Sequence, residues 1–170
     1  MAKIEPAFRP PEAITAAHDT GPFASTRDTL NVWLKRHALK NEGRTSRTYV
    51  VAQGTRVVGF YALAAGGVTR DTPPRSVRHD SPSTVPLVVL GRLATDQTFE
   101  GRGIGSGMLR DAIARTLRSA GEIGVRGLVV HALDDDATKF YLRYGFVPCP
   151  VGERTLFLAV ETALRALSAK

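Results

Sequence analysis

The chain has 170 residues, a single cysteine and a formal net charge of +7. One cysteine excludes a disulfide framework and a thiolate metal cluster, and no apolar run reaches the roughly 18 residues of a membrane span. The start, Met1-Ala2-Lys3-Ile4-Glu5-Pro6, lacks the apolar core of a signal peptide. We therefore expect a cytoplasmic protein without a membrane contact, folded as one domain over residues 1–170. The positive charge favours a polyanionic partner, nucleic acid above all.

The first part of the chain predicts a lead-in and a helix. Residues 1–24 are rich in proline and favour irregular structure with one short edge strand. The pattern Ser25-x-x-Asp28 is typical of a helix start, and the helix is expected to end near Gly43. Its buried stripe should consist of Leu30, Trp33, Leu34, His37 and Ala38. The cations on other faces include Lys35 and Arg36, which form either a nucleic-acid contact or a solvated face.

A hairpin and a long loop follow. Residues 47–52 and 56–64 predict two strands joined by the turn Gln53-Gly54-Thr55. Residues 65–84 are turn-rich and polar, and predict a surface loop with room for a short helix. The loop carries Arg75 and Arg78 just before the next strand, so it is a candidate for binding an anionic substrate. The alternative is a solvated loop.

The central strand leads into a glycine-rich turn and a long helix. The apolar run over residues 85–94 predicts a buried strand, within which Arg92 should face a carboxylate, solvent or a phosphate. After the turn, helical spacing predicts a buried stripe made by Ile104, Met108, Leu109, Ala112, Ile113, Leu117 and Ala120.

The turn itself predicts a phosphate site. Glycines at a helix start leave the first N–H groups unpaired and uncovered, at the positive end of the helix dipole. The dinucleotide fingerprint fails here because the third glycine is missing, and no Gly-Lys pair exists for a P-loop. The alternative is a set of plain turn glycines. The expected phosphate-binding residues are Gly101, Arg102, Gly103, Ile104, Gly105 and Ser106.

The last third predicts a strand, a short helix and a final strand. Residues 127–132 predict a buried strand. We interpret His131 in this strand as a core histidine, with a catalytic base as the alternative. Asp134-Asp135-Asp136 are better explained as helix N-cap and first-turn acids than as a cation site. The helix should stop at Gly145. Residues 154–160 predict the last strand and residues 161–170 a helical or frayed tail.

Two segments resemble motifs of the GNAT superfamily of N-acetyltransferases. Arg102 with Gly103 and Gly105 resembles motif A, and Ala137-x-x-Phe140-Tyr141-x-x-x-Gly145-Phe146 resembles motif B. The resemblance implies the α/β (α+β) GNAT fold, a mixed central sheet of about six to seven strands flanked by about four helices. It implies acetyl-CoA as co-substrate and no metal. Glu100 and Asp134 depart from the family pattern.

The resemblance also implies roles for residues. The glycine-rich turn would hold the pyrophosphate, and the backbone of Leu93, Ala94 and Thr95 would meet the acetyl and pantetheine parts. Tyr141 would protonate or hydrogen-bond the departing thiolate. Cys149 is not expected to act as a nucleophile, because nothing in the sequence places a histidine beside it.

A narrower resemblance concerns the GNAT toxins of type II toxin–antitoxin modules that acetylate charged tRNA. It is carried by Trp33-Leu34-Lys35, Gly59-Phe60-Tyr61, Gly91-Arg92-Leu93-Ala94 and Arg154-Thr155-Leu156-Phe157-Leu158. It implies acetylation of the α-amino group of aminoacyl-tRNA, which blocks translation, and a ribbon-helix-helix antitoxin. We also expect a homodimer. The tRNA contacts would come from Arg92, Arg75, Arg78, Lys35 and Arg36. Two alternatives stay open: an enzyme acetylating a small-molecule or protein amine, and a non-catalytic acetyl-CoA-fold binding module.

Overall fold

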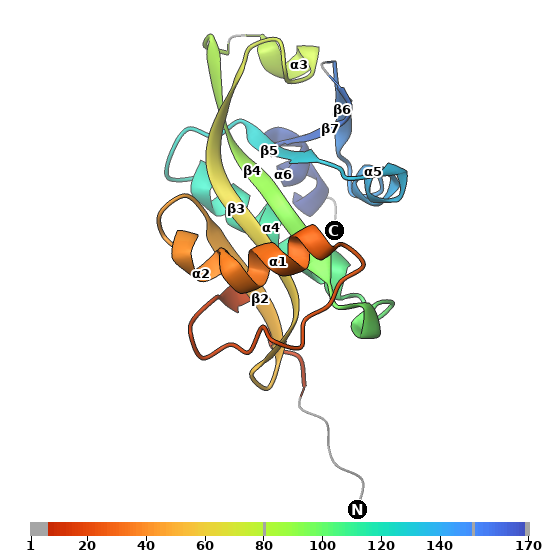
Figure 1. The fold of residues 1–170 in the computed structure, drawn as a ribbon. Helices are drawn as coiled ribbons and strands as arrows, with labels where there is room; N and C mark the ends of the chain where they lie inside the picture. The colour runs from red at the N-terminus through yellow and green to blue at the C-terminus, as the bar shows by residue number, and fades with distance from the viewer. Residues whose placement is uncertain (1–6, 80, 151, 169–170) are drawn as a thin grey trace, which may run out of the picture. The chain divides into compact units, whose positions relative to one another are not determined.

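A seven-stranded mixed sheet with the order β1-β2-β3-β4-β5-β7-β6 forms the centre of the fold. The structure, a computed structural model, describes residues 7–79, 81–150 and 152–168 (Figure 1). In chain order the elements are β1 Glu12–Ala13, α1 Asp28–Arg36, α2 Ala38–Asn41, β2 Arg47–Gln53, β3 Arg56–Thr69, α3 Arg75–Arg78, β4 Thr84–Thr95, the 3₁₀ helix η1 Gln97–Phe99, α4 Ile104–Ala120, β5 Gly127–His131, α5 Asp135–Leu142, β6 Val147–Cys149, β7 Gly152–Ala159 and α6 Val160–Ser168.

The strand directions confirm the fold class that the sequence predicts. β4 and β5 are parallel, whereas β1–β2, β2–β3, β5–β7 and β6–β7 are antiparallel. Six α-helices occur among the described residues where about four were expected, because α2 and α3 are single turns of four residues. No helix within the described ranges is long and apolar enough to cross a bilayer.

The chain divides into two compact units. The first comprises Met1–Leu63 and Arg92–Asp111, and the second comprises Ala64–Gly91 and Ala112–Lys170. In the first unit β2 and β3 form the predicted hairpin, with Tyr49 opposite Tyr61 and a bulge at Val51/Ala52. Its apolar cluster is made by Ile14, Phe23, Leu30, Leu34, Ala38, Val50, Val57, Phe60 and Ala94.

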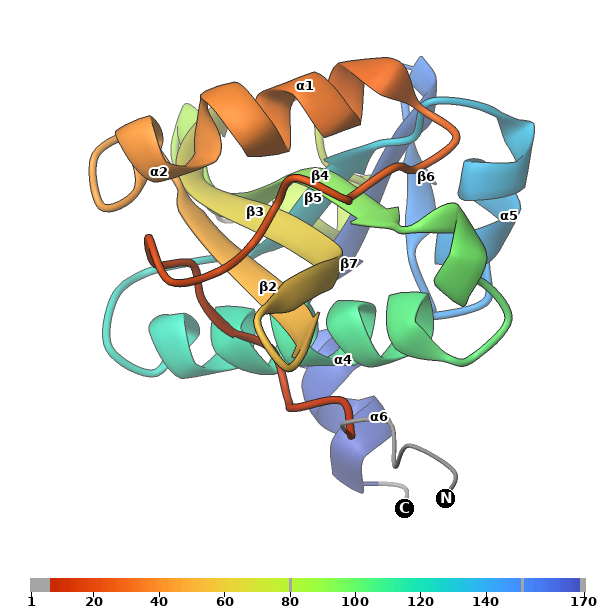
Figure 2. The same ribbon diagram turned by 60° about the horizontal axis from the view of Figure 1, so that its bottom comes forward.

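Helices cover both faces of this hairpin (Figure 2). Phe60 of β3 points to the α1 face, where its ring stacks on Trp33 with centroids 6.0 Å apart. Its neighbour Gly59 points to the α4 face, and a Cβ there would lie 2.9 Å from Ile104 Cγ2. A side chain larger than hydrogen at this position would therefore push the first turn of α4 away from β3. Farther along, the Tyr61 hydroxyl donates a hydrogen bond to Asp111 of α4.

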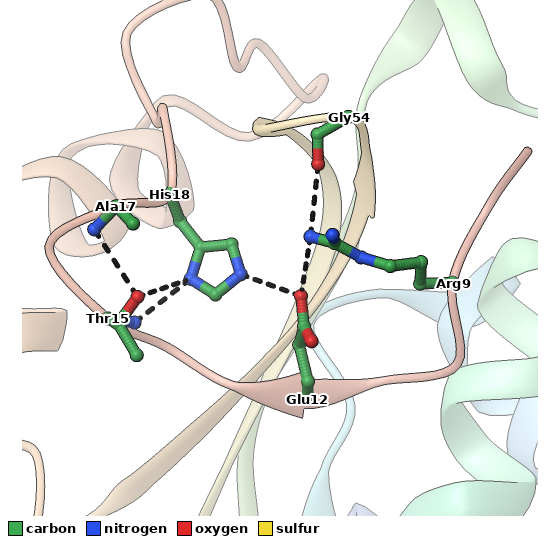
Figure 3. A network of polar contacts seen from close by, with 6 residues as sticks. All are labelled: Arg9, Glu12, Thr15, Ala17, His18 and Gly54. Carbon is green, nitrogen blue, oxygen red and sulfur yellow. Dashed lines mark hydrogen bonds and ion pairs between the residues drawn. The ribbon is translucent and has the colours of Figure 1, made fainter. Parts of the chain in front are cut away.

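The lead-in is fixed to the hairpin by polar contacts (Figure 3). Glu12 Oε1 accepts hydrogen bonds from Arg9 at 2.8 Å and from His18 Nε2 at 2.9 Å, and Arg9 also donates to the Gly54 carbonyl at 3.0 Å. His18 Nδ1 accepts from the backbone N–H of Thr15, so the ring donates from Nε2. The hydrogen bond from His18 and the charge of Arg9 hold the pKa of Glu12 below its ordinary value.

The second unit is built on β5. Val88–Leu90 of β4 lie parallel to Leu128–Val130, and β7 pairs along the full length of β5 on its other side. The core contains Val77, Leu87, Val129, Cys149 and Phe157. Both α5 and α6 contact β7. Arg126, just before β5, donates to Glu161 of α6 at 2.8 Å.

Several local expectations were wrong. β3 continues to Thr69, beyond the expected end at residue 64, because Gly66 admits Val89: a Cβ there would lie 2.7 Å from Val89 Cγ2. The helix over residues 28–41 is interrupted, since His37 leaves helical geometry between α1 and α2 and is exposed. Ser25 does not cap α1; its hydroxyl donates to Asn31 Oδ1 at 2.7 Å. Residues 1–6 of the lead-in and 169–170 of the tail lie outside the described residues.

Candidate active site

The glycine-rich turn before α4 exposes a row of backbone donors. Gly101 and Gly103 adopt φ values of 77° and 79°, which L side chains rarely tolerate. The first helical bond runs from the Gly107 N–H to the Gly103 carbonyl at 3.0 Å. The N–H groups of Ile104, Gly105 and Ser106 therefore have no acceptor within the described part of the chain. A Cβ at Gly101 or Gly103 would meet nothing within 4 Å, so the turn that precedes these donors borders open space.

Asp96, which lies just before the turn, fixes the segment that leads into it through buried hydrogen bonds. This carboxylate is 1% exposed and accepts from the backbone N–H of Ala24 at 3.0 Å and from Thr98 N and Oγ1 at 2.9 and 2.7 Å. Arg56 lies 3.8 Å away. Burial raises the pKa of Asp96, but the hydrogen bonds and the Arg56 charge outweigh it, so that pKa lies below its ordinary value.

Phe99 supplies the apolar side of the same anchor. It is buried in the 3₁₀ helix η1, and its ring lies 5.0 Å from the Arg102 guanidinium carbon and 5.1 Å from that of Arg56. Arg102 is exposed beside the open N–H groups. A turn with three free donors, a helix dipole and an exposed cation beside it suits the oxygens of a pyrophosphate.

The end of β4 lies beside this turn. Paired residues of β4 and β5 end at Leu90, and Leu93, Ala94 and Thr95 follow farther along β4. Thr95 points to the α4 side, where its Oγ1 would lie 3.6 Å from a Cβ on Gly105. The strand end and the helix start therefore adjoin, as the sequence predicts.

Tyr141 belongs to the second unit. It is 6% exposed in α5, and its ring packs edge-on against Phe140 and Phe146. Its hydroxyl makes no hydrogen bond to the described residues, and burial raises the pKa of the phenol above its ordinary value near 10. The phenol is thus neutral at physiological pH and its donor is unused. Tyr144 follows the C-terminal end of α5, and its ring contacts that of Phe140.

These features agree with the match to a protein family. The sequence profile of the acetyltransferase (GNAT) domain matches residues 44–148, which include the glycine-rich turn and Tyr141. The chain belongs to the GNAT acetyltransferase family. Enzymes of this family use acetyl-CoA, and the open row of N–H groups fits its pyrophosphate.

Individual relatives of this GNAT chain are toxins. The chain is 42% identical to the tRNA-acetylating toxin of Mycobacterium tuberculosis (strain H37Rv) over 161 residues, 94% of this chain and 96% of the relative. AtaT complexed with acetyl-methionyl-tRNAfMet superimposes with a TM-score of 0.86 at 26% identity, covering 95% of this chain and 99% of AtaT. A tyrosine-to-phenylalanine mutant of AtaT, bound to the C-terminus of the antitoxin AtaR and acetyl-CoA, gives a TM-score of 0.81 at 25% identity, covering 95% and 99%.

The basic residues fall into two groups on this GNAT fold. In the first unit Arg92 reaches α1, where its guanidinium carbon lies 4.1 Å from the centre of the Trp33 ring. Lys35 and Arg36, in the last turn of α1, are exposed. Arg75 and Arg78 belong to α3 of the second unit, where Arg75 is exposed and the buried Arg78 Nε has no partner among the described residues. Of the five residues, the structure joins Arg92 with the helix that carries Lys35 and Arg36.

Other sequence expectations for the site have mixed outcomes. His131 is exposed rather than buried, because it ends β5, and its Nδ1 lies 3.1 Å from Thr155 Oγ1. Asp134 caps α5 as expected, accepting from Ala137 N at 2.8 Å. Cys149 is buried, and burial raises the pKa of its thiol. The described residues contain no group of three or more His, Cys, Asp or Glu side chains arranged for a metal.

Asp96 and Gly59 were missed by sequence reasoning. Asp96 follows the central strand directly, and an acid there two residues before Thr98 is a possible cap signal. The bond to Ala24 has no local signal at all. Gly59 gives a weak one, since an isolated glycine inside a strand pattern often marks a close approach of another element.

Proposed function

We propose that this chain is a toxin that uses acetyl-CoA to acetylate the α-amino group of aminoacyl-tRNA and so blocks translation. The proposal is carried by the 42% identity to a tRNA-acetylating toxin over nearly the whole of both chains. It is supported by the open donors at the start of α4 and by the similarity to AtaT in complex with acetyl-methionyl-tRNAfMet. The residues that match the family, 44–148, include parts of both compact units.

Acetyl-CoA supplies the activated acetyl thioester. The N–H groups of Ile104, Gly105 and Ser106 would bind its pyrophosphate oxygens, with Gly101 and Gly103 keeping the approach open and Arg102 adding charge. The backbone of Leu93, Ala94 and Thr95 would bind the pantetheine and acetyl parts. A backbone N–H of this strand end would donate to the carbonyl oxygen as negative charge develops on it.

Tyr141 would hold a proton at its hydroxyl for the sulfur that leaves. A thiol has a pKa of roughly 8.5, so complete transfer from a phenol costs about 1.4 kcal/mol for each unit by which the phenol pKa is higher. Because burial raises the pKa of Tyr141, its main contribution is a hydrogen bond that strengthens as charge develops on sulfur.

The acceptor amine needs no protein base. A free α-amine titrates near 7.7–8.0, and the neighbouring ester of an aminoacyl-tRNA lowers that value. Much of the acceptor is therefore neutral near pH 7, and water can take its proton. A lysine ε-amine, with a pKa near 10.4, would need a base.

We assign the RNA contacts to Arg92, Lys35 and Arg36 of the first unit and to Arg75 and Arg78 of the second. These are side chains that would meet phosphates, and the net charge of +7 favours the encounter. The partner that silences the toxin would be an antitoxin, by analogy with AtaR on AtaT, and we expect it to be of the ribbon-helix-helix type. The toxin would act in the cytoplasm as a homodimer. Sedimentation of the purified chain tests whether it is a dimer.

The proposed acceptor is tested by competition. Purified protein receives labelled acetyl-CoA together with charged tRNA, uncharged tRNA, a peptide and a polyamine. We expect label on charged tRNA only, lost when the ester is hydrolysed beforehand. Label on the peptide or polyamine alone would support the alternative acetyltransferase. Toxicity in cells that persists in Tyr141→Phe would support a non-catalytic binding module.

A further inference from the structure

Trp33, Phe60 and Arg92 form a layered group, here called the Trp33 stack. The Trp33 ring lies nearly parallel to Phe60, at an interplanar angle of 11° and a centroid distance of 6.0 Å. The Arg92 guanidinium lies over the Trp33 ring, 4.1 Å from its centre. Phe60 is fully buried, whereas Trp33 and Arg92 are half-buried. The stack therefore leads from the core of the first unit outward to a charged group at the surface.

The N–H donors of Arg92 are unused. A guanidinium has five of them in one plane, and none donates to an acceptor among the described residues. Burial also lowers the pKa of Arg92, because partly removing the guanidinium from water disfavours its charged form. Packing on Trp33 explains the orientation of the guanidinium, and its donors stay open to solvent because Arg92 is half-buried. An anion can displace that water and accept hydrogen bonds from them.

The surroundings favour an anion with flat apolar parts. Arg36 and Lys35 are exposed on the same helix as Trp33 and add positive charge. A phosphate can accept two parallel hydrogen bonds from the edge of a guanidinium, and a nucleobase can stack on an aromatic or guanidinium plane. An acidic protein segment would offer carboxylates but no such planes, so single-stranded RNA fits this chemistry better.

The position of Arg92 on β4 connects the stack to the reaction. Side chains alternate along a strand: Ala94 belongs to the apolar cluster under α1, and Thr95 points to the α4 side. Arg92 is on the α1 side with Ala94, immediately before Leu93. A nucleotide at the Trp33 stack would thus lie on the face of the sheet opposite the glycine-rich turn, next to the strand end assigned to the acetyl group.

We propose that the Trp33 stack binds the 3′-terminal nucleotides of the acceptor RNA, with Arg92 on a phosphate and Trp33 as the positioning residue that fixes the guanidinium plane. This assignment rests on the proposed function, because it takes the acceptor to be aminoacyl-tRNA. It goes further by naming the part of the RNA that is bound and the ring that aligns the cation.

Trp33 is the one tryptophan of the sequence, so intrinsic fluorescence reports the stack directly. The probe is a short oligoribonucleotide ending in cytidine-cytidine-adenosine, titrated into the full chain without acetyl-CoA. We expect a saturable change of Trp33 fluorescence. Arg92→Gln should weaken binding about 10- to 100-fold through the lost charged hydrogen bonds. Arg92→Lys, which keeps the charge but loses the plane, should weaken it about 10-fold.

Arg110→Gln is the matched control, because it removes an equal charge from an exposed position of α4 and should leave oligonucleotide binding within about twofold. Trp33→Phe, followed by filter binding, should retain more affinity than Trp33→Leu. In the enzymatic assay the variants of Arg92 and Trp33 should raise KM for charged tRNA while leaving KM for acetyl-CoA unchanged. Thermal unfolding shows which variants remain folded.

Binding of the oligonucleotide without a fluorescence change, or equal binding by folded Arg92→Gln, would overturn the assignment. A fluorescence response to a glutamate-rich peptide but not to RNA would also overturn it and indicate a protein contact. Normal acetylation of charged tRNA by Arg92→Gln would refute the RNA-binding role of the Trp33 stack and leave the proposed function unaffected. Arg92-dependent binding of the oligonucleotide without acetylation of any charged tRNA would refute the proposed function and support the stack as an RNA site.

Discussion

The Asp96 carboxylate accepts a hydrogen bond at 3.0 Å from the backbone N–H of Ala24, which lies 72 residues earlier in the chain. The same residue joins β3 through its own N–H, which donates to the Val58 carbonyl at 2.8 Å. Asp96 thus connects the end of the lead-in, the hairpin and the approach to the glycine-rich turn. If the turn binds the pyrophosphate as proposed, its geometry depends on a residue that need not touch that ligand.

Asp96→Asn should loosen this junction. The amide keeps one acceptor oxygen but loses the charge-assisted bonds, so the free energy of unfolding should fall by about 1–3 kcal/mol and KM for acetyl-CoA should rise. Chemical denaturation and steady-state kinetics measure the two effects. Asp71→Asn, at an exposed position of the loop before α3, is the control and should change neither quantity.

The lowered pKa of Asp96 predicts that the stability of the protein depends on pH. The pKa of Asp96 is lowered on folding from an ordinary value of 3.8, so the unfolded state binds the proton more readily. The stabilisation is complete above that ordinary value and is lost as pH falls through the lowered value. The difference in unfolding free energy between wild type and Asp96→Asn should shrink over that acidic range. A difference that stays constant down to the lowest pH measured would contradict the assigned charge effect.

Gly103→Ala should damage the turn while Gly107→Ala should not. Gly103 has a φ of 79°, which costs an alanine roughly 1–2 kcal/mol. Gly107 lies inside α4 at an ordinary φ, with nothing within 4 Å of an added Cβ, so alanine there should stabilise the protein by about 0.5–1 kcal/mol. We expect a higher KM for acetyl-CoA only in Gly103→Ala. An equal rise in both variants would argue against the assigned donors.

Gly59→Ala tests whether the close packing of α4 against β3 requires a glycine at this position. An alanine Cβ would lie 2.9 Å from Ile104 Cγ2 and 3.0 Å from Met108 Sδ, closer than stable contacts allow. Overpacking of this kind costs about 1–3 kcal/mol, and displacing Ile104 should also raise KM for acetyl-CoA. Gly124→Ala, in open space, is the control. Unchanged stability and kinetics in Gly59→Ala would show that the helix start moves freely.

Much of the fold follows from local sequence signals, and its long-range contacts do not. The helix from Ile104 to Ala120 and the hairpin over residues 47–64 were recognisable because their periodicity and turn residues are local. The predicted stripe of that helix is buried only in its first half: Ile113, Leu117 and Ala120 are half-buried. Gly66 and Gly67 look like turn residues, yet they belong to β3, because close packing against Val89 and Thr84 favours small residues there. His37 fits a buried stripe by spacing alone, but the break between α1 and α2 exposes it.

The candidate site divides in the same way. The sequence indicated the glycine-rich turn and Tyr141 through motifs whose spacing is fixed by one helix each. The Trp33 stack joins residues 33, 60 and 92, and the Tyr61–Asp111 bond joins β3 to α4 across 50 residues. No pattern within one element specifies which distant side chain it meets, since that depends on how the elements pack.

Tyr141→Phe should lower kcat about 100- to 10,000-fold with KM for acetyl-CoA little changed. Its hydroxyl makes no hydrogen bond to the described residues, so the free energy of unfolding should stay within about 0.5 kcal/mol of wild type. Tyr144→Phe is the matched control one turn away and should keep its activity. Full activity in Tyr141→Phe would remove the assigned proton donor.

The most direct test of the account identifies the acetylated atom. Charged tRNA is incubated with the purified protein and acetyl-CoA, digested with nuclease, and the aminoacyl-adenosine is analysed by tandem mass spectrometry. We predict an acetyl group on the α-amine of the amino acid, and none when Tyr141→Phe replaces the wild type. Unmodified aminoacyl-adenosine from every charged tRNA, with acetyl transfer to another amine in the same mixture, would contradict the account.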